Sequence, residues 1–136
     1  MNPEALGRLV IGMALISILS PFKAWAVETR VDDSKAIHAI LGEANNAKER
    51  HAIAHAIRNR GHLGGVYGHM DNPSEVEYQA GCKAWYESEY TTDPTHGADH
   101  WLSDYDLKHS KKHLIAFRFK MVETAYIGNT HFYKER

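Results

Sequence analysis

The sequence predicts an α+β domain, with several helices in its N-terminal part and a small antiparallel sheet or hairpin near the C-terminus. Apolar residues recur at helical spacing over residues 37–44, and a helix start signal precedes a second such pattern at residues 76–85. Apolar and polar residues alternate on both sides of Gly128-Asn129, as in a β-hairpin. The chain has 136 residues and no internal repeat, which is enough for one domain.

The first two helices are expected between residues 34 and 59. Three residues in a row can cap the first helix, and they are Asp32, Asp33 and Ser34. Its apolar stripe follows at i, i+3, i+4 and i+7, and consists of Ile37, Ile40, Leu41 and Ala44. The second helix, at about 47–59, is rich in alanine and carries Ile53 and Ile57.

Four glycines make residues 61–72 a loop, and a third helix is expected after it. Asn72 is a suitable N-cap, Pro73 suits the first helical position and Glu75 lies three residues after the cap. This helix is expected to end near Ser88 and to bury four apolar residues, which are Val76, Ala80, Ala84 and Trp85.

The C-terminal third begins with a turn-rich stretch, residues 89–100, which contains Asp93-Pro94 and Gly97. A further helix is expected at 104–117, because Leu107, Leu114 and Phe117 are spaced helically. The hairpin is expected from Val122 to Tyr133, with its turn at Gly128-Asn129.

The N-terminus resembles a secretory signal more than a part of the domain. A polar segment ending in Arg8 precedes the uncharged apolar run 9–20, and the small-x-small sequence Ala24-Trp25-Ala26 follows. The expected arrangement is a signal peptide at 1–26, or a membrane anchor if uncleaved, and an exported domain at 27–136. The alternative is a buried core helix, because an apolar run of 12 residues is short for a membrane span.

The net charge of the expected exported domain indicates which partners it can bind. Removal of residues 1–26 would leave 14 Lys and Arg against 16 Asp and Glu, a net charge of −2. This balance argues against a nucleic-acid partner, which usually needs a basic face.

The single cysteine, Cys82, cannot form an internal disulfide, so the fold depends on its hydrophobic core. We interpret Cys82 as a packing residue on a helix.

Glu43 is the first candidate catalytic residue. It lies near the end of the first helix, between Leu41 and Ala44, and a carboxyl held against apolar groups keeps its proton more readily. A general acid needs such a carboxyl near neutral pH. The alternative is an ordinary solvated glutamate on a helix.

Histidines at i, i+4 could bind zinc from one face of a helix, and the pairs are His51/His55, His96/His100 and His109/His113. However, Ala52 stands where the zinc-protease motif needs its glutamate, and spacing indicates no third ligand. Surface or hydrogen-bonded histidines are the simpler interpretation, and no metal ligand is assigned.

Two further polar segments are candidates for a groove. Residues 93–98 combine Asp93, Thr95 and Gly97 in a Gly/Pro turn, which could be only a turn. In the last strand, alternation places His131 and Tyr133 on one face and Phe132 on the other. These two could line a polar groove or simply cover a half-buried sheet.

Taken in order, these segments resemble the SleB-type family of cell-wall hydrolases, which includes spore cortex-lytic enzymes and related bacterial and phage proteins. The resemblance spans roughly residues 37–134. The matching segments are Ile40-Leu-Gly-Glu-Ala44, Ala52-Ile-Ala-His-Ala-Ile-Arg-Asn-Arg60, Gly65-Val-Tyr-Gly68, Ala84-Trp85, Asp93-Pro-Thr-His-Gly-Ala98 and Ile127-Gly-Asn-Thr-His-Phe-Tyr133. The chain departs from the family pattern at Asn45–Arg50, which is about two residues shorter and more charged than in many relatives.

The resemblance implies a lysozyme-like α+β fold and cleavage of peptidoglycan between N-acetylmuramic acid and N-acetylglucosamine. We expect no cofactor and a monomer. The resemblance also implies that Glu43 is the catalytic acid. Six other residues become candidates for the substrate groove, and they are Tyr67, Asp93, Thr95, Trp101, His131 and Tyr133.

The sequence is compatible with more than one reaction type. A lytic transglycosylase needs only Glu43, whereas a two-carboxylate hydrolase needs a second acid, for which Asp93 and Asp99 are candidates. A zinc-dependent amidase or peptidase acting on the peptide stems would instead use the histidines. A non-catalytic wall-binding module would keep the groove aromatics and tolerate loss of Glu43.

Overall fold

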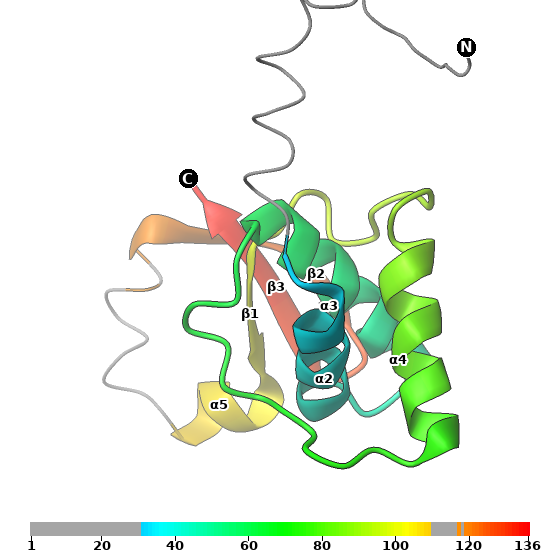
Figure 1. Ribbon diagram of the computed structural model, residues 1–136. Helices are drawn as coiled ribbons and strands as arrows, with labels where there is room; N and C mark the ends of the chain where they lie inside the picture. Colours follow the sequence, from blue (N-terminus) through cyan, green and yellow to red (C-terminus); the bar gives the residue numbers. More distant parts are fainter. Residues whose placement is uncertain (1–30, 110–116, 118) are drawn as a thin grey trace, which may run out of the picture. The chain divides into compact units, whose positions relative to one another are not determined.

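The computed structural model describes residues 31–109, 117 and 119–136. The expected signal peptide or membrane anchor at 1–26 lies outside this part of the chain. In the described ranges, no helix is both long enough and apolar enough to cross a membrane. The elements, labelled as in Figure 1, are α2 (Asp33–Glu43), α3 (Ala47–Arg60), α4 (Glu75–Glu87), β1 (His100–Ser103), α5 (Asp104–His109), β2 (Met121–Ile127) and β3 (Thr130–Glu135).

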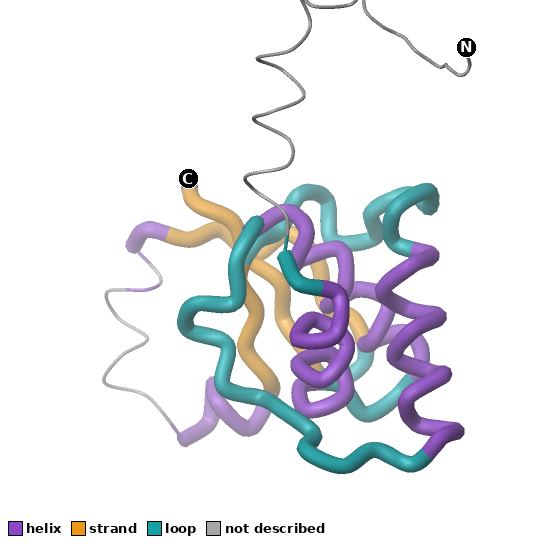
Figure 2. Tube along the Cα trace, in the orientation of Figure 1, coloured by secondary structure: helices purple, strands orange, loops and turns teal. Residues whose placement is uncertain are grey.

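The predicted α+β class is confirmed at this level. Figure 2 shows the helical segments α2, α3 and α4 grouped together, with the strands beside them. The three described strands form one antiparallel sheet in the order β1-β3-β2, so that β3 lies in the middle and β1 at an edge. The sheet contacts the helical group through α3, which packs against both β1 and β2.

The first two helices begin and end close to the predicted residues. Asp32 caps α2 by accepting a hydrogen bond from the Lys35 backbone N–H at 3.0 Å, as one of the three candidate caps. Asn46 caps α3 in the same way, and α3 ends where Gly61 adopts a φ of 79°, a left-handed conformation that glycine tolerates. The apolar stripe of α2 is buried as predicted.

The third helix begins two residues later than predicted. Ser74, not Asn72, is its N-cap, and Ser74 forms a reciprocal capping box with Glu77. The predicted burial of Val76 is wrong, because Val76 is 80% exposed. The face of α4 that packs against the other helices carries Gly81, Ala84 and Trp85, and Val76 does not lie on it.

The stretch 89–100 is irregular as predicted, but a short strand begins at its last residue. This strand, β1, pairs antiparallel with β3, with Trp101 opposite Phe132. Of the helix predicted at 104–117, the structure describes α5, which spans Asp104–His109, and a helical conformation at residue 117, while residues 110–116 lie outside the described part. The predicted hairpin is confirmed as β2 and β3, with Gly128 at a φ of 61° in the turn.

Two buried polar groups tie the helices and the sheet together. Trp85 is 2% exposed, and its indole N–H donates to Asp33 Oδ1 at 2.7 Å while the Arg58 guanidinium stacks on its ring at 3.7 Å. Glu49 is 1% exposed and accepts hydrogen bonds from the backbone N–H groups of Asn45 and Asn129. Because Asn129 lies in the hairpin turn, Glu49 fixes that turn against the start of α3.

Candidate functional site

Glu43 is held at the point where α2, the loop 61–72 and the edge strand β1 meet. The Gly68 backbone N–H donates to Glu43 Oε2 at 2.6 Å, and the Trp101 indole N–H donates to Oε1 at 3.0 Å. Both carboxyl oxygens therefore have a hydrogen-bond partner, which fixes the orientation of the side chain. The side chain is only partly buried, so a ligand can reach it.

Two glycines allow the loop to lie directly against the end of α2. A Cβ atom on Gly42 would clash with the backbone of His69, and one on Gly68 would clash with the Glu43 carboxyl group. The contact is completed by Met70, whose backbone N–H donates to His38 O at 3.1 Å and whose carbonyl lies 2.6 Å from His38 Nδ1. The Gly-Glu sequence at the end of the first helix thus has a packing reason as well as a chemical one.

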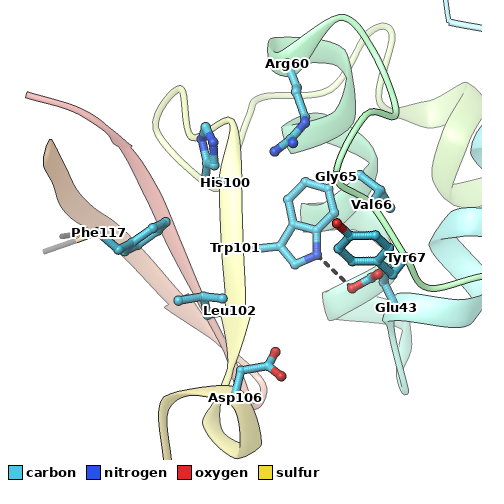
Figure 3. Close-up of a pocket in the computed structure, with 10 residues that line it drawn as sticks. All are labelled: Glu43, Arg60, Gly65, Val66, Tyr67, His100, Trp101, Leu102, Asp106 and Phe117. Atoms are coloured by element: carbon cyan, nitrogen blue, oxygen red, sulfur yellow. Dashed lines mark hydrogen bonds between the residues drawn. The ribbon is translucent and has the colours of Figure 1, made fainter. Parts of the chain in front are cut away.

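Glu43 opens into a cavity of about 490 Å³, which is within the size range of small-molecule sites. Figure 3 shows Trp101 pointing from β1 toward Glu43, with Tyr67 beside the carboxyl group and Arg60 above the indole ring. His100 and Leu102 point away on the other side of β1, so the cavity reaches over the edge of the sheet. Its described lining residues are Glu43, Arg60, Gly65, Val66, Tyr67, His100, Trp101, Leu102, Asp106 and Phe117.

The structure brings together three of the seven site residues proposed from the sequence, which are Glu43, Tyr67 and Trp101. Tyr67 is 92% exposed, so its ring is available to a ligand. Trp101 is half-buried because its ring lies between the helices and the open cavity. In this cavity the oriented Glu43 carboxyl group therefore lies beside the rings of Tyr67 and Trp101, so that a group able to exchange a proton and two apolar ring surfaces meet there.

Asp93 and Thr95 do not line this cavity. The Asp93 carboxylate accepts hydrogen bonds from the Thr95 backbone N–H and hydroxyl, from the Gly97 N–H and from the Asn59 amide. Burial raises the pKa of Asp93, but these hydrogen bonds outweigh it and the net shift is downward. Thr95 is fully buried. This turn fixes the chain just before β1, and so acts on the site through the position of Trp101.

His131 and Tyr133 lie on the opposite face of the sheet from Trp101. The register explains this, because Trp101 is opposite Phe132, whereas His131 and Tyr133 are opposite Leu102 and His100. Tyr133 is 8% exposed and contacts the ring of Phe117, which itself lines the cavity. Tyr133 therefore supports the cavity wall without being among its lining residues.

His131 belongs to a polar cluster on that face. Its Nε2 lies 2.7 Å from Asp104 Oδ1 and its Nδ1 lies 3.1 Å from Glu123 Oε1. The ring also stacks on Tyr126, whose hydroxyl donates to Asp104 Oδ2. Hydrogen bonds from Tyr126 and His131 lower the pKa of Asp104. These contacts join β2, β3 and the start of α5, which is a structural role.

Sequence reasoning missed three polar residues that line the cavity: Arg60, His100 and Asp106. Arg60 lies in a segment that resembles the family, but nothing in its spacing marked it as a site residue. Asp106 had a readable local signal, because Ser103 and Asp106 have the spacing of a capping box. The structure shows that box, with the Asp106 carboxylate accepting from the Ser103 N–H and hydroxyl and the Asp106 N–H donating to Ser103 Oγ.

Histidines of the candidate zinc-binding pairs contact other protein side chains. His55 Nε2 lies 3.0 Å from Thr91 Oγ1, and His51 packs edge-on against the His55 ring. His100 Nδ1 lies 2.8 Å from Asp99 Oδ1. His113 lies outside the described residues. Within the part of the chain that the structure describes, no group of three or more His, Cys, Asp or Glu side chains is placed to hold a metal ion.

Comparisons with protein-family models, with curated proteins and with solved structures give no match for this chain.

Proposed function

We propose that this protein cleaves the glycan strands of peptidoglycan between N-acetylmuramic acid and N-acetylglucosamine, with Glu43 as the proton donor. The observation that supports it best is the Glu43 carboxyl group, which Gly68 and Trp101 orient in an open cavity beside the exposed Tyr67. A lysozyme-like fold and membership of the SleB-type family are parts of this proposal, and both rest on the sequence resemblance.

The aromatic side chains provide the second line of support. A sugar ring presents an apolar face of C–H groups, and such faces pack well on indole and phenol rings. Trp101 and Tyr67 offer two such rings close to Glu43 (Figure 3). A sugar bound on them would have its glycosidic oxygen within reach of the carboxyl group.

The favoured reaction is that of a lytic transglycosylase. Protonated Glu43 donates its proton to the glycosidic oxygen while the bond from that oxygen to the anomeric carbon of the muramic acid breaks. The resulting carboxylate accepts the proton of the C6 hydroxyl on the same sugar, and that oxygen bonds to the anomeric carbon. One carboxyl group acts twice, no water is consumed and the new end is a 1,6-anhydro sugar.

A hydrolase is the second candidate, and the geometry of the cavity changes which residue would serve it. A hydrolase needs a second carboxylate to activate water or to act as nucleophile. Asp106 lines the same cavity as Glu43, whereas Asp93 is occupied by its own turn and Asp99 faces His100. Of the two Asp106 carboxylate oxygens, only Oδ2 accepts hydrogen bonds from residues that the structure describes. Asp106 therefore replaces Asp93 and Asp99 as the proposed second acid.

Export is part of the proposal, because peptidoglycan lies outside the cytoplasmic membrane. Residues 1–26 would supply it, either as a cleaved signal peptide or as a membrane anchor that keeps the domain near the wall. We propose no cofactor, and we propose that the protein acts as a monomer.

The deciding experiment is digestion of purified peptidoglycan with the wild-type protein, Glu43→Gln and Asp106→Asn, with products identified by mass spectrometry. Glu89→Gln is the matched control, because the Glu89 side chain is exposed on the surface and lies outside the cavity lining. We expect anhydro-muramic ends from the wild type, Asp106→Asn and the control, and no products from Glu43→Gln.

Reducing sugar ends that disappear in both Glu43→Gln and Asp106→Asn would identify a hydrolase with Asp106 as the second acid. Release of free peptide stems would contradict glycan cleavage and favour an amidase. Glycan cleavage by Glu43→Gln at the wild-type rate would contradict the role of Glu43.

A further inference from the structure

Arg60 places a positive charge in the wall of the Glu43 cavity. It is the last residue of α3, and Figure 3 shows its guanidinium above the Trp101 ring. Its Nη1 donates to Asp99 O at 3.1 Å and its Nη2 donates to Gly64 O. Both acceptors are neutral backbone carbonyls, so these bonds hold the side chain in place without neutralising its charge.

No carboxylate of the described residues lies within ion-pair distance of Arg60. The described salt bridges involve other cations, and the two acids that share the cavity lining, Glu43 and Asp106, contact other partners. The buried Arg60 Nε–H also has no acceptor in this part of the chain. A partly desolvated cation without a counter-ion costs free energy, which a bound anion would offset.

The other charged groups of the cavity lining do not favour an anionic ligand. The ionised carboxylate of Asp106 would repel a carboxylate that enters the cavity, and Glu43 acts in its protonated form. Among the described lining residues, only Arg60 is a lysine or an arginine. A guanidinium has five N–H donors and two are used here, so each Nη group keeps one N–H for a ligand.

We propose that Arg60 binds a carboxylate of the substrate and so makes the cavity selective for muramic-acid-containing strands over neutral N-acetylglucosamine polymers. This inference rests on the proposed function. The carboxylate has two possible sources, the lactyl group of muramic acid once its peptide is removed, and the acidic residues of an attached peptide stem. The Arg60 guanidinium carbon lies 6.0 Å from the centroid of the Trp101 ring, which places the charge next to any sugar that stacks on that ring (Figure 3).

The test is a binding measurement on Glu43→Gln, which cannot turn over its ligand, with Arg60 intact or changed to Gln or Lys. Three probes are titrated by calorimetry: a neutral chito-oligosaccharide, a peptide-free muramic acid disaccharide repeat, and the same glycan with its peptide stems. Lys83→Gln, which removes an exposed cation on α4, is the matched control. Urea unfolding shows whether each variant keeps its fold.

We expect Arg60→Gln to raise the Kd about tenfold or more for carboxylate-bearing probes, and to leave the Kd for the neutral probe within about twofold. Arg60→Lys restores part of the affinity. Loss on the peptide-free probe identifies the lactyl carboxylate, and loss only on the stem-bearing probe identifies the peptide.

Equal losses on neutral and anionic probes would mean that Arg60 only positions the loop, and would overturn the inference while leaving the proposed function intact. If Arg60→Gln binds every probe as tightly as the Glu43→Gln parent does, the inference about Arg60 is also overturned and the proposed function is not affected. If the Glu43→Gln parent binds none of the three glycans, the proposed function itself fails.

Discussion

At the scale of single residues, the site depends on how the Glu43 carboxyl group is oriented. Trp101→Phe keeps a ring for sugar stacking but removes the N–H that donates to Glu43 Oε1. Loss of one positioning hydrogen bond is expected to lower kcat about three- to tenfold with little change in KM. Steady-state kinetics on solubilised glycan strands measure both constants. A rise in KM with kcat unchanged would show that Trp101 acts only by stacking.

A substitution at Gly68 tests the orientation of the Glu43 carboxyl group by adding a methyl group next to it. In Gly68→Ala the new methyl group would clash with the Glu43 carboxyl group and displace it from the cavity. A displacement of about 1 Å can reduce the rate about 100-fold. Gly64→Ala is the matched control, since a Cβ there would meet only the flexible His62 side chain, at 3.2 Å. Equal activity of the two variants would mean that the loop moves freely away from Glu43.

The sequence identified some site residues and not others for a physical reason. Glu43 and Trp101 could be found because a carboxyl group and an indole bear the chemistry themselves. Asp93 also lies in a segment that matches the family pattern, but its carboxylate holds together the turn that precedes β1. A one-dimensional match does not separate a residue that touches a ligand from one that positions its neighbour. Arg60 was missed because the feature that makes it a candidate is that no carboxylate of the described residues pairs with it, which only coordinates show.

At the scale of secondary-structure elements, Glu49 joins α3 to the β2–β3 hairpin. Glu49→Gln keeps the shape but places an amide N–H₂ against a backbone N–H of Asn45 or Asn129. One buried donor is then left without an acceptor, at a cost of about 1–3 kcal/mol in the free energy of unfolding. Urea titrations of Glu49→Gln beside Glu89→Gln measure this cost. A loss below about 0.5 kcal/mol would contradict the role of Glu49.

The start of α4 provides a sharp comparison between two neighbouring caps. Ser74 accepts the Glu77 N–H at 3.1 Å, whereas Asn72, the cap predicted from the sequence, lies outside the helix. Ser74→Ala is expected to lower the free energy of unfolding by about 1 kcal/mol, and Asn72→Ala by less than about 0.5 kcal/mol. Chemical denaturation measures both. The opposite order would restore Asn72 as the cap.

Elements with a long, regular pattern were predicted well, and short ones were not. The hairpin was found because its alternation and its Gly-Asn turn agree, and α2 was found because caps and apolar stripe agree. β1 has only four residues, and it is a strand because β3 offers it hydrogen bonds, which no local pattern records. Val76 is apolar yet exposed, because the packing of α4 against the other helices decides which face is buried.

At the scale of the whole molecule, one buried histidine couples folding to pH. His55 is 5% exposed on α3, and burial, reinforced by the nearby His51 and Arg58, lowers its pKa from 6.5, while Asp93 opposes the shift. The Thr91 hydroxyl donates to Glu87 O, so that His55 Nε2–H donates to Thr91 in the neutral ring. The neutral form is thus the one that the folded state favours.

A lowered histidine pKa means that the unfolded chain binds more protons than the folded protein at mildly acidic pH. The stabilisation is complete above pH 6.5 and is lost as the pH falls from 6.5 to the lower folded-state value. The loss is about 1.4 kcal/mol for each unit of pKa difference. Asp93, with its lowered pKa, adds a second loss below pH 3.8, its ordinary value.

Urea unfolding from pH 8 to 5 should therefore show that the free energy of unfolding of the wild type falls, and that it falls less steeply in His55→Gln. A steeper fall in His55→Gln would mean that protonated His55, through Asp93, stabilises the fold.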